Sequence, residues 1–302
     1  MKEELNYLKD KFGKNVIFEE NLAKYNWFNV GGSAEIFFRP ISLDQLCEFY
    51  KAIKNLSKPI HLIGAGSNIL VRDGGVKGVV IKLGSKLSYL KRIEKNIIEA
   101  GAATLDKNLA NFAMENSIGG FEFMSCIPGS VGGAIIMNSG CYDEDISTII
   151  KSVKILNIHG DVEEIEKDDI QFVYRSSSIK KNSIIISAKF EGIVKDKYSI
   201  KKKQEDLINK KKETQPKNIK TGGSTFKNPP NLKAWKLIDD SDCKNISVGK
   251  AKISNLHSNF FINSGNASSK DIETLMQTVK KKVEDKTGIS LELEIKLIGE
   301  KN

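Results

Sequence analysis

The sequence predicts an α+β fold in two parts, and three observations support this. Segments with the apolar spacing of helices are interspersed with short runs of strand-forming residues. The chain has 302 residues, 40% of them hydrophobic, which is enough for two domains. A lysine-rich segment at 195–215 is followed by Pro216, and the change in composition there marks the expected boundary.

The first part is expected to begin with a charged amphipathic segment and then to alternate helices with strands. Residues 42–55 have helical spacing of apolar side chains and begin with Ser42 as a cap. Residues 104–117 are predicted to form a second helix, capped by Thr104. Strand-like runs are expected within residues 59–83, 150–157 and 183–192.

The second part is expected to follow a long exposed helix at 195–215 that Pro216 ends. A strong helix at 268–286 is predicted, with Ser268 or Ser269 as its cap. The remaining expected elements are a loop at 221–230, a short helix near 233–239, β-type residues around 258–263, and a final strand, SLELEIKLIG, at 290–299.

Charge and cysteine content narrow the class of protein. The net charge is +9, yet only four basic residues are arginine and the lysines are mixed with acidic residues, which favours a solvated surface over a nucleic-acid interface. The four cysteines have no CxxC spacing and the three histidines lie far apart, so no metal site is expected. No apolar run reaches membrane-helix length and no secretory signal is present, so a cytoplasmic protein is expected.

Two glycine-rich segments are the main chemical signals. Small residues let backbone N–H groups approach an anion closely, so both segments suggest a dinucleotide diphosphate. The first segment, residues 64–68, is not a Rossmann fingerprint, because Ile69 stands where the third glycine would be and the following residues favour a strand. A plain turn is the alternative reading of that segment alone. The second segment is residues 127–134. The candidate cofactor-binding residues are Gly64, Ala65, Gly66, Ser67, Asn68, Ile127, Pro128, Gly129, Ser130, Gly132 and Gly133.

An ordered set of motifs gives a specific resemblance. The loop at 64–68, the hairpin DGGVKGVVI and IPGSVGGA resemble the FAD-binding domain of vanillyl-alcohol-oxidase-type flavoproteins. Further motifs extend the match in order along almost the whole chain, with VGG before the loop and the others after it: YRSS, TQP, GGSTFKNP, HSNFFIN and LELEIKLIG. With this set the sequence resembles the UDP-N-acetylenolpyruvoylglucosamine reductases.

This resemblance implies an FAD-binding domain of two α+β subdomains and a C-terminal α+β substrate-binding domain. The expected boundaries are 1–20 for an N-terminal helical segment, 21–195 for the FAD-binding domain and 196–302 for the substrate-binding domain. The implied activity is NADPH-dependent reduction of UDP-N-acetylglucosamine enolpyruvate to UDP-N-acetylmuramate, in peptidoglycan precursor synthesis. FAD would be bound non-covalently, since neither glycine loop contains a histidine. The partners would be small molecules, with no membrane or nucleic acid, and the enzyme would be a monomer.

The implied chemistry requires an anchor for carboxylate charge and an acid that protonates carbon. Arg175 in YRSS can hold a carboxylate in a bidentate fork, although a surface ion pair is the alternative. By resemblance Ser224 is the proton donor, although a turn serine is the alternative from the residues alone. By resemblance Glu294 assists it, with Glu292 on the same strand face as the fallback.

Substrate contacts are expected from Asn228, Lys212 and His257. Asn228 matches a family position that contacts the UDP-sugar, Lys212 could pair with the diphosphate, and His257 could instead be an ordinary surface residue. The segment 138–143 departs from the family pattern, which leaves that loop open. Two other functions remain possible: another oxidoreductase of the same flavin fold, and a flavin-free UDP-sugar-binding regulator.

Overall fold

The structure, a computed structural model, describes residues 2–56, 58–180 and 182–301. The chain divides into two compact units, and each is assembled from three stretches of sequence. The first unit comprises residues 1–17, 37–65 and 79–211, and the second comprises residues 18–36, 66–78 and 212–302. Both contain helices and sheets, which confirms the α+β class.

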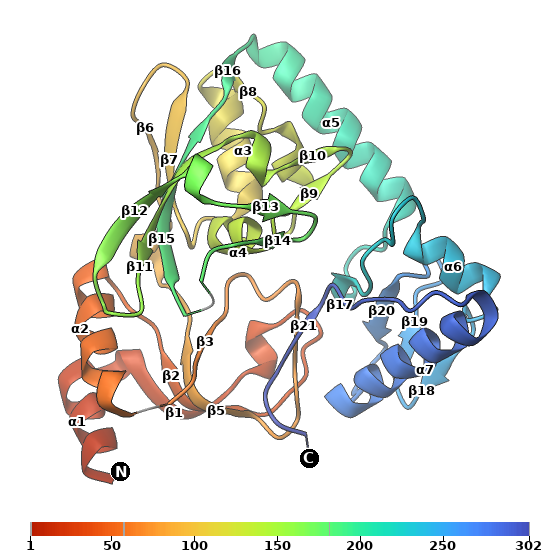
Figure 1. The fold of residues 1–302 in the computed structure, drawn as a ribbon, viewed down its shortest axis with the longest axis horizontal. Helices are drawn as coiled ribbons and strands as arrows, with labels where there is room; N and C mark the ends of the chain where they lie inside the picture. The colour runs from red at the N-terminus through yellow and green to blue at the C-terminus, as the bar shows by residue number, and fades with distance from the viewer. Residues whose placement is uncertain (1, 57, 181, 302) are drawn as a thin grey trace. The chain divides into compact units, whose positions relative to one another are not determined.

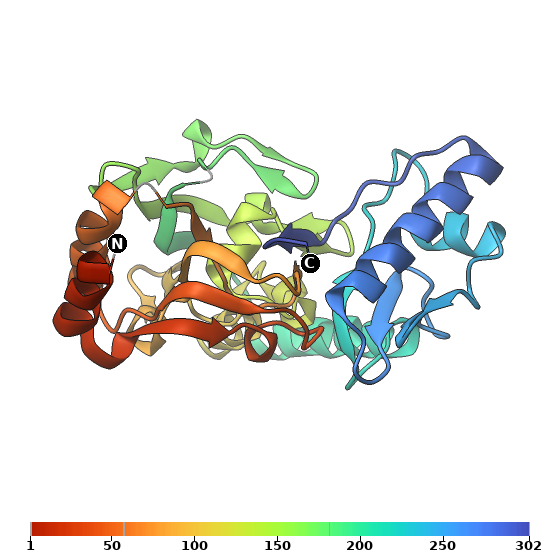
Figure 2. The ribbon, with the colours of Figure 1, turned by 90° about the horizontal axis from the view of Figure 1, so that it is seen from below.

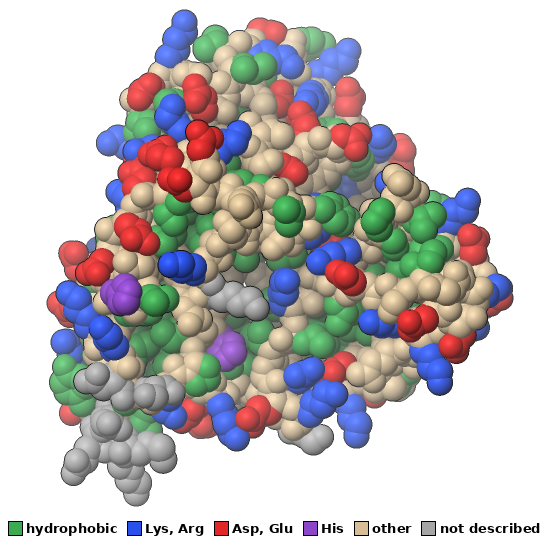
Figure 3. Space-filling view, in the orientation of Figure 1, with side chains coloured by type: hydrophobic (Ala, Val, Ile, Leu, Met, Phe, Trp, Pro, Cys, Tyr) green, Lys and Arg blue, Asp and Glu red, His purple; other side chains and the backbone are tan. Residues whose placement is uncertain are grey.

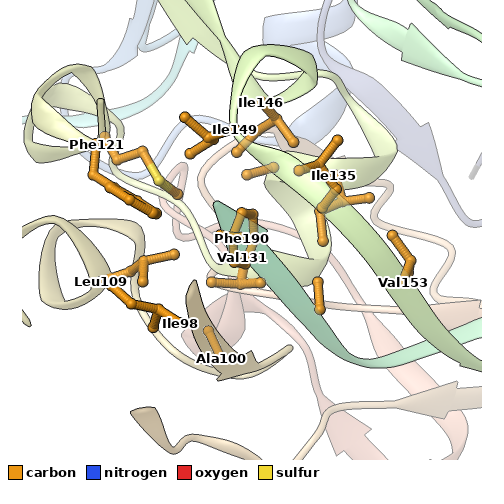
Figure 4. Packing of buried hydrophobic residues seen from close by; sticks show 14 of the residues in the cluster. Ile98, Ala100, Leu109, Phe121, Val131, Ile135, Ile146, Ile149, Val153 and Phe190 are labelled. Atoms are coloured by element: carbon orange, nitrogen blue, oxygen red, sulfur yellow. The ribbon is translucent and has the colours of Figure 1, made fainter. Parts of the chain in front are cut away.

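A five-stranded antiparallel sheet of order β12-β11-β15-β7-β6 organises the first unit (Figure 1). Its strands are β6 Leu90–Arg92, β7 Ile97–Gly101, β11 Ile150–Leu156, β12 Val162–Glu166 and β15 Ile184–Glu191. Two helices, α3 Asp106–Glu115 and α4 Val131–Ile136, contribute to the same core. Leu109, Val131 and Phe190 are fully buried in this core (Figure 4). Val131 belongs to the second glycine loop, so the core holds that loop in place.

Helices α1 Lys2–Phe12 and α2 Leu43–Ile53 also belong to the first unit. Phe38 and Phe49 stack with their ring centroids 3.6 Å apart, and Phe12 meets both rings edge-on. Residues 16–81 contribute a four-stranded sheet of order β1-β2-β5-β3. The chain crosses from one unit to the other within β1, within β2 and within β5. The strands of this sheet are β1 Val16–Asn21, β2 Ser33–Phe38, β3 Ile60–Leu62 and β5 Val76–Ile81.

The second unit has a four-stranded antiparallel sheet of order β17-β20-β19-β18, and α7 packs on it (Figure 2). Ser268 accepts a hydrogen bond from Asp271 N and forms a capping box that starts α7, and Gly288 in the left-handed region ends it. The elements are β17 Lys220–Ser224, α6 Ala234–Asp240, β18 Ser247–Val248, β19 Ala251–Ile253, β20 Phe260–Asn263 and α7 Ser269–Thr287.

A parallel pair joins two distant segments inside the second unit. β4 Ile69–Val71 pairs with β21 Lys296–Ile298. The Arg72 guanidinium forks onto the carboxylate of Glu273 on α7, at 2.9 and 3.0 Å, and also donates to the carbonyl of Gly299 at 3.2 Å. Because Glu273 is largely buried, this pair gains more than a surface ion pair does and fixes the segment 66–78 to the C-terminal part of the chain.

The remaining elements are short strands and one long helix. The helix α5 Lys197–Thr214 has only Ile200 and Gln204 buried and ends before Pro216, as its composition predicted. The short strands pair as β8 Ile118–Gly119 with β16 Ile193–Val194, β9 Gly140–Cys141 with β10 Glu144–Asp145, and β13 Phe172–Val173 with β14 Ser176–Ser177.

Three sequence-based predictions of local structure were wrong. Thr104 does not cap α3, because its hydroxyl donates to the carbonyl of Tyr89 and the helix begins only at Asp106. Part of the predicted loop 221–230 is strand β17, which pairs with β20. The final strand is shorter than predicted: β21 covers three residues, and the preceding segment pairs only through an isolated bridge between Phe226 and Leu293.

Charged side chains of both signs are interspersed on the face shown in Figure 3. Within the described residues, no group of three or more metal-ligating side chains is positioned to hold a metal ion. No helix in this part of the chain is long and apolar enough to span a membrane.

Candidate active site

The first glycine loop contributes residues to both units. In the first unit, Gly64 lies against Ser130 of the second glycine loop: a Cβ added at Gly64 would stand 2.5 Å from the Ser130 hydroxyl oxygen. Lys82, which follows β5, donates its ammonium to the carbonyl of Gly64. Burial lowers the pKa of Lys82, so this cation is held in a site of reduced water access beside the loop. The structure therefore brings the two predicted loops together at this point and adds a positive charge.

The second glycine loop is held by the strand-like segment before α3. The amides of Val131 and Gly132 donate to the carbonyls of Thr104 and Ala102, both at 2.9 Å, and Asp106 N donates to Gly129 O at 3.2 Å. These bonds fix the loop's shape before any ligand binds. They also mean that the Val131 and Gly132 amides are used by the chain itself.

Asp106 is a buried acid next to this loop. Its side chain is fully buried, and neither carboxylate oxygen has a hydrogen-bond partner among the described residues. One of these oxygens lies 2.3 Å from where a Cβ of Gly129 would be. Burial raises the pKa of Asp106 well above its ordinary range, so the carboxyl group is held neutral and has a proton to donate.

The rest of the first loop lies in the second unit, against residues 22–30. Trp27 N donates to Gly66 O at 2.9 Å, and a Cβ at Gly66 would stand 2.0 Å from Tyr25 O. Asn26 is buried and its side-chain amide donates to the carbonyls of Leu22 and Val30. Gly66 also has φ +73°, so both the backbone conformation and the close approach require glycine here.

Within the second unit, the predicted proton donor and its predicted assistant lie on neighbouring segments. Glu294 N donates to the carbonyl of Thr225, the residue after Ser224, at 2.9 Å. The side-chain amide of Asn68 donates to Glu294 O at 3.2 Å, and Lys296 N donates to Asn68 O at 3.0 Å. Ser224 and Glu294 are both half-buried. These hydrogen bonds thus join Asn68 and Glu294 to each other and Glu294 to Thr225, the residue after Ser224.

A buried asparagine that sequence reasoning missed fixes the segment after Ser224. Asn259 exchanges two hydrogen bonds with the main chain of Phe226, at 2.9 and 2.8 Å, and its carbonyl accepts from Thr225 N at 2.8 Å. His257 Nδ1 accepts from Asn259 N at 3.2 Å. Burial lowers the pKa of His257, which keeps the ring neutral and able to accept this bond. The motif HSNFFIN therefore serves to position residues 225 and 226.

Arg175 lies in the first unit, at the two-residue turn between β13 and β14. Its backbone is in the left-handed region, at φ +59°, which is uncommon for a residue that is not glycine. The guanidinium donates to Gly140 O at 3.1 Å and lies over the Tyr174 ring, 4.7 Å from its centroid. The side chain is half-buried. This strained turn holds the guanidinium in a defined direction.

The other candidate residues differ in how the structure uses them. Asn228 is exposed, and its side-chain oxygen accepts from Ala234 N at 2.9 Å at the start of α6. Lys212 is exposed on α5. Glu292, the fallback for Glu294, has a 76% exposed side chain that pairs with Lys227 at 3.3 Å. That exposure makes Glu292 the weaker candidate for an acid shielded from water.

The residues around the two loops fit a dinucleotide such as FAD. Gly133 faces open space, since a Cβ there would meet only Ser130 Oγ at 3.6 Å. A half-buried cation, Lys82, stands beside the loops and suits the anionic part of such a ligand, while the buried acid Asp106 is neutral and does not repel it. Sequence reasoning missed both, because an isolated Asp in a helical pattern and one Lys among many give no signal.

Comparisons with known proteins agree with these features. A family model described as UDP-N-acetylenolpyruvoylglucosamine reductase, C-terminal domain, matches residues 215–298, and one described as FAD binding domain matches residues 34–166. The UDP-N-acetylenolpyruvoylglucosamine reductase of Pelagibacter ubique is 44% identical over 299 residues, covering 98% of this chain and 99% of that protein. The reductase of Caulobacter vibrioides is 42% identical over 286 residues, covering 94% and 95%. The crystal structure of the Thermus caldophilus reductase matches with a TM-score of 0.81 and 28% identity, over 94% of this chain and 98% of that one.

Gly133 offers a test of cofactor approach that leaves the chain undisturbed. Gly133→Ala and Gly133→Val should weaken FAD binding progressively, by ~10-fold or more for valine, because the added side chain stands on the open face of the loop. Quenching of flavin fluorescence on titration measures the affinity. The thermal midpoint of the flavin-free protein should change little. Unaltered FAD affinity in both variants would show that the ligand does not approach Gly133.

Gly66 and Gly132 are the contrasting positions. Gly66→Val should destabilise the flavin-free protein through the clash with Tyr25 O. At Gly132 a Cβ would stand 3.1 Å from the Ala102 Cβ, so loss of flavin there would not distinguish ligand exclusion from local repacking.

The buried acid predicts a pH dependence of stability. Because the native pKa of Asp106 is raised, its contribution is fully present below the unfolded-state pKa, about 3.9, and is lost as pH rises toward the native pKa. Over that window the flavin-free protein should lose about 1.4 kcal/mol per pH unit relative to Asp106→Asn, which cannot ionise. Denaturant unfolding at pH 5 and pH 8 measures the difference. Asp161→Asn, at an exposed aspartate, is the control and should track the parent; an equal pH dependence in Asp106→Asn would refute the assignment.

Proposed function

The chain belongs to the UDP-N-acetylenolpyruvoylglucosamine reductase family, and on that premise we propose that it reduces UDP-N-acetylglucosamine enolpyruvate to UDP-N-acetylmuramate in peptidoglycan precursor synthesis. It is an FAD-dependent oxidoreductase, with NADPH as the electron donor. The observation that carries the proposal is the main-chain bond between Glu294 and Thr225, which sets residue 294 next to the residue that follows Ser224.

The two glycine loops, Lys82 and Asp106 are proposed to hold the cofactor. Bound FAD supplies the two-electron redox chemistry that converts the enolpyruvyl double bond to the saturated lactyl ether. Lys82 is positioned to balance phosphate charge, and the neutral, fully buried Asp106 lies behind Gly129 and adds no negative charge to the cradle. The backbone amides of the loops that the chain does not already use complete the cradle.

Ser224 and Arg175 are proposed to act on the substrate. As the double bond is reduced, negative charge moves toward the substrate carboxylate, and a fixed guanidinium such as that of Arg175 stabilises it. The adjacent carbon then needs a proton, which the Ser224 hydroxyl delivers. A hydroxyl is a weak acid, so the half-buried Glu294 carboxyl is proposed to assist it or to relay the proton.

The proposed substrate contacts are Asn228, Lys212 and His257, which differ in their exposure and in their hydrogen bonds. Lys212 is exposed and can reach a diphosphate. His257 is held by its bond to Asn259 N, so it contributes through its other ring nitrogen or through the position of Phe226. We further propose that the enzyme is cytoplasmic, because its UDP-sugar and NADPH are cytoplasmic metabolites. We also propose that it is a monomer, which sedimentation at assay concentration tests.

Anaerobic reduction of the purified protein tests the function directly. NADPH should bleach the flavin absorbance, and the enolpyruvyl UDP-sugar should restore it. A colourless protein that binds UDP-sugar would instead indicate a regulator that has kept the fold. A flavin that NADPH or an alcohol reduces but the enolpyruvyl compound does not reoxidise would indicate another oxidoreductase of the same fold.

Ser224→Ala separates chemistry from binding. Bleaching of the flavin by NADPH should be normal, because that step does not protonate a substrate carbon. Reoxidation by the UDP-sugar should slow by ~10²-fold or more, the usual scale for a positioned acid, with little change in substrate affinity. Stopped-flow absorbance measures both steps, and Ser264→Ala, at an exposed serine of the same unit, is the control. Equal slowing of the two steps would make Ser224 a structural residue.

Arg175→Lys keeps the charge and removes the planar fork. The substrate step should slow by ~10-fold or more, equivalent to about 1.4 kcal/mol, while bleaching by NADPH suffers much less. Lys180→Arg, an exposed cation beyond the same hairpin, is a matched control for exchange of the two side chains. If the substrate step were unchanged in Arg175→Lys, the residue would serve only to hold Gly140.

A further inference from the structure

Two cysteines that the proposed reaction does not use meet at the base of the second glycine loop. Cys126 ends the 3₁₀ helix Glu122–Cys126 directly before the loop, and Cys141 lies on β9 directly after α4. Cys141 Sγ lies 3.4 Å from the carbonyl oxygen of Phe123, which belongs to the same 3₁₀ helix as Cys126, and β9 packs against this helix. Both are free thiols, and both lie in the first unit. The fold thus places two cysteines that are fifteen positions apart in sequence on neighbouring segments.

The surroundings of the pair are polar and positively charged. Lys211 on α5 donates its ammonium to Cys126 O, and the Ser125 hydroxyl lies 3.8 Å from Cys126 Sγ. Arg175 donates to the carbonyl of Gly140, the residue before Cys141. Cations next to a sulfur atom favour its thiolate form, which is the form that reacts with oxidants.

The two thiols are not equivalent. The hydrogen bond from Cys141 lowers the pKa of Cys126 to about 6, and the same bond raises the pKa of Cys141. Burial lowers the pKa of Lys211, which nevertheless adds to the stabilisation of the Cys126 thiolate. A cysteine with a lowered pKa beside a cysteine with a raised pKa is the arrangement of an attacking and a resolving thiol. Cys141 is the more exposed of the two.

We propose that Cys126 and Cys141 are a redox modification site at which hydrogen peroxide forms an intramolecular disulfide across the base of the cofactor loop. The Cys126 thiolate attacks one peroxide oxygen and becomes a sulfenic acid, releasing hydroxide. Cys141 then attacks the Cys126 sulfur, forming the S–S bond and displacing the second oxygen as hydroxide or, with the thiol proton, as water. In total, two thiols are oxidised by two electrons and one peroxide is reduced to two waters. A dithiol reductant reverses the reaction.

The disulfide should have two consequences for the protein. It closes the segment 127–140 into a covalent ring that contains the second glycine loop and α4, so the unfolded chain is restrained and the folded protein is stabilised. It also draws Cys141 toward Cys126, which displaces the neighbouring Gly140 carbonyl that holds Arg175. The second consequence rests on the role proposed for Arg175 and predicts slower substrate reduction.

Mass spectrometry of the FAD-loaded protein tests the site without reference to activity. No Lys or Arg lies between Lys107 and Lys151, so both cysteines fall in one tryptic peptide, 108–151. After peroxide and then an alkylating agent, this peptide should lack both alkyl groups and be lighter than the reduced peptide by two hydrogen atoms. Further cleavage between residues 126 and 141 should leave the two fragments linked. Dithiothreitol should restore two alkylated cysteines.

Matched variants separate the pair from general oxidation. Cys126→Ser and Cys141→Ser should each abolish the linked peptide, whereas Cys47→Ser, at a half-buried cysteine of the same unit, should respond like the parent. Peroxide should raise the thermal midpoint of the parent by about 5 °C or more and leave that of Cys126→Ser unchanged. Irreversible sulfinic acid on Cys126 with an unlinked Cys141, or two thiols that stay alkylatable, would overturn the proposal. If Cys126→Ser does not fold, Cys141→Ser alone decides between these outcomes.

Turnover provides the functional readout, with each variant before peroxide as its own reference. The oxidised parent should lose activity by ~10-fold, reversibly, with bleaching by NADPH retained. A linked peptide with unchanged turnover would support the disulfide and reject its coupling to Arg175. A preparation without reductase activity that still forms the linked peptide would contradict the proposed function and support the thiol site.

Discussion

The parallel pairing of β4 with β21 is the constraint on which the candidate proton-transfer site depends. It joins the end of the first glycine loop to the C-terminal strand, so that Lys296 N bonds to Asn68 O while the Asn68 side chain bonds to Glu294 O. Glu294 is then bonded through its amide to Thr225. The main chain of Glu294 therefore connects Asn68, in the segment 66–78, with Thr225, in the segment 212–302. Removing any of these bonds would loosen the main chain of Glu294 against the segment that follows Ser224.

The pairing is itself supported by a largely buried ion pair. Arg72 follows β4 directly and forks onto Glu273 of α7, while its own amide bonds to Ile298 O at 2.9 Å. The hydrogen bonds from Arg72 lower the pKa of Glu273, so the pair persists well below neutral pH. A bidentate fork restricts both distance and direction, which suits a short strand pair that few backbone bonds would otherwise fix. The ion pair with α7 thus helps to fix the pairing of β4 with β21 in the second unit.

Sequence reasoning succeeded where structure is set by neighbouring residues. The helices α2 and α7 were predicted with Ser42 and with Ser268 or Ser269 as their caps, of which the structure selects Ser268, because a cap and an apolar stripe are both local. The ordered glycine and serine motifs identified the loops and the family for the same reason. The three-segment composition of each unit was not predictable, because segments 18–36 and 66–78 pack with residues that lie far along the chain.

The same distinction explains the error at α3 and the residues that were missed. Thr104 is a good helix cap by composition, yet the backbone there is committed to Val131, so the helix starts later. Asp106, Lys82 and Asn259 act through contacts with segments remote in sequence. Nothing in a single sequence distinguishes them from the many other acidic, basic and amide residues. The Cys126–Cys141 contact is hidden in the same way, since fifteen positions separate the two residues.

The glycine motifs combine two physical requirements that look alike in sequence. Gly66 and Gly129 are required by the chain, since a Cβ there would strike Tyr25 O or the Asp106 carboxyl group. Gly133 has no such neighbour within the described residues, as the nearest atom to its Cβ, Ser130 Oγ, is at an ordinary contact distance. The proposed approach of the cofactor to Gly133 gives a reason for the glycine there, since the chain's own packing gives none. The loop's intramolecular bonds to Thr104 and Ala102 set its shape in advance, so binding does not have to order a glycine-rich segment. On the proposed binding mode, affinity for the cofactor should depend on the few open positions such as Gly133, and not on the number of glycines in the motif.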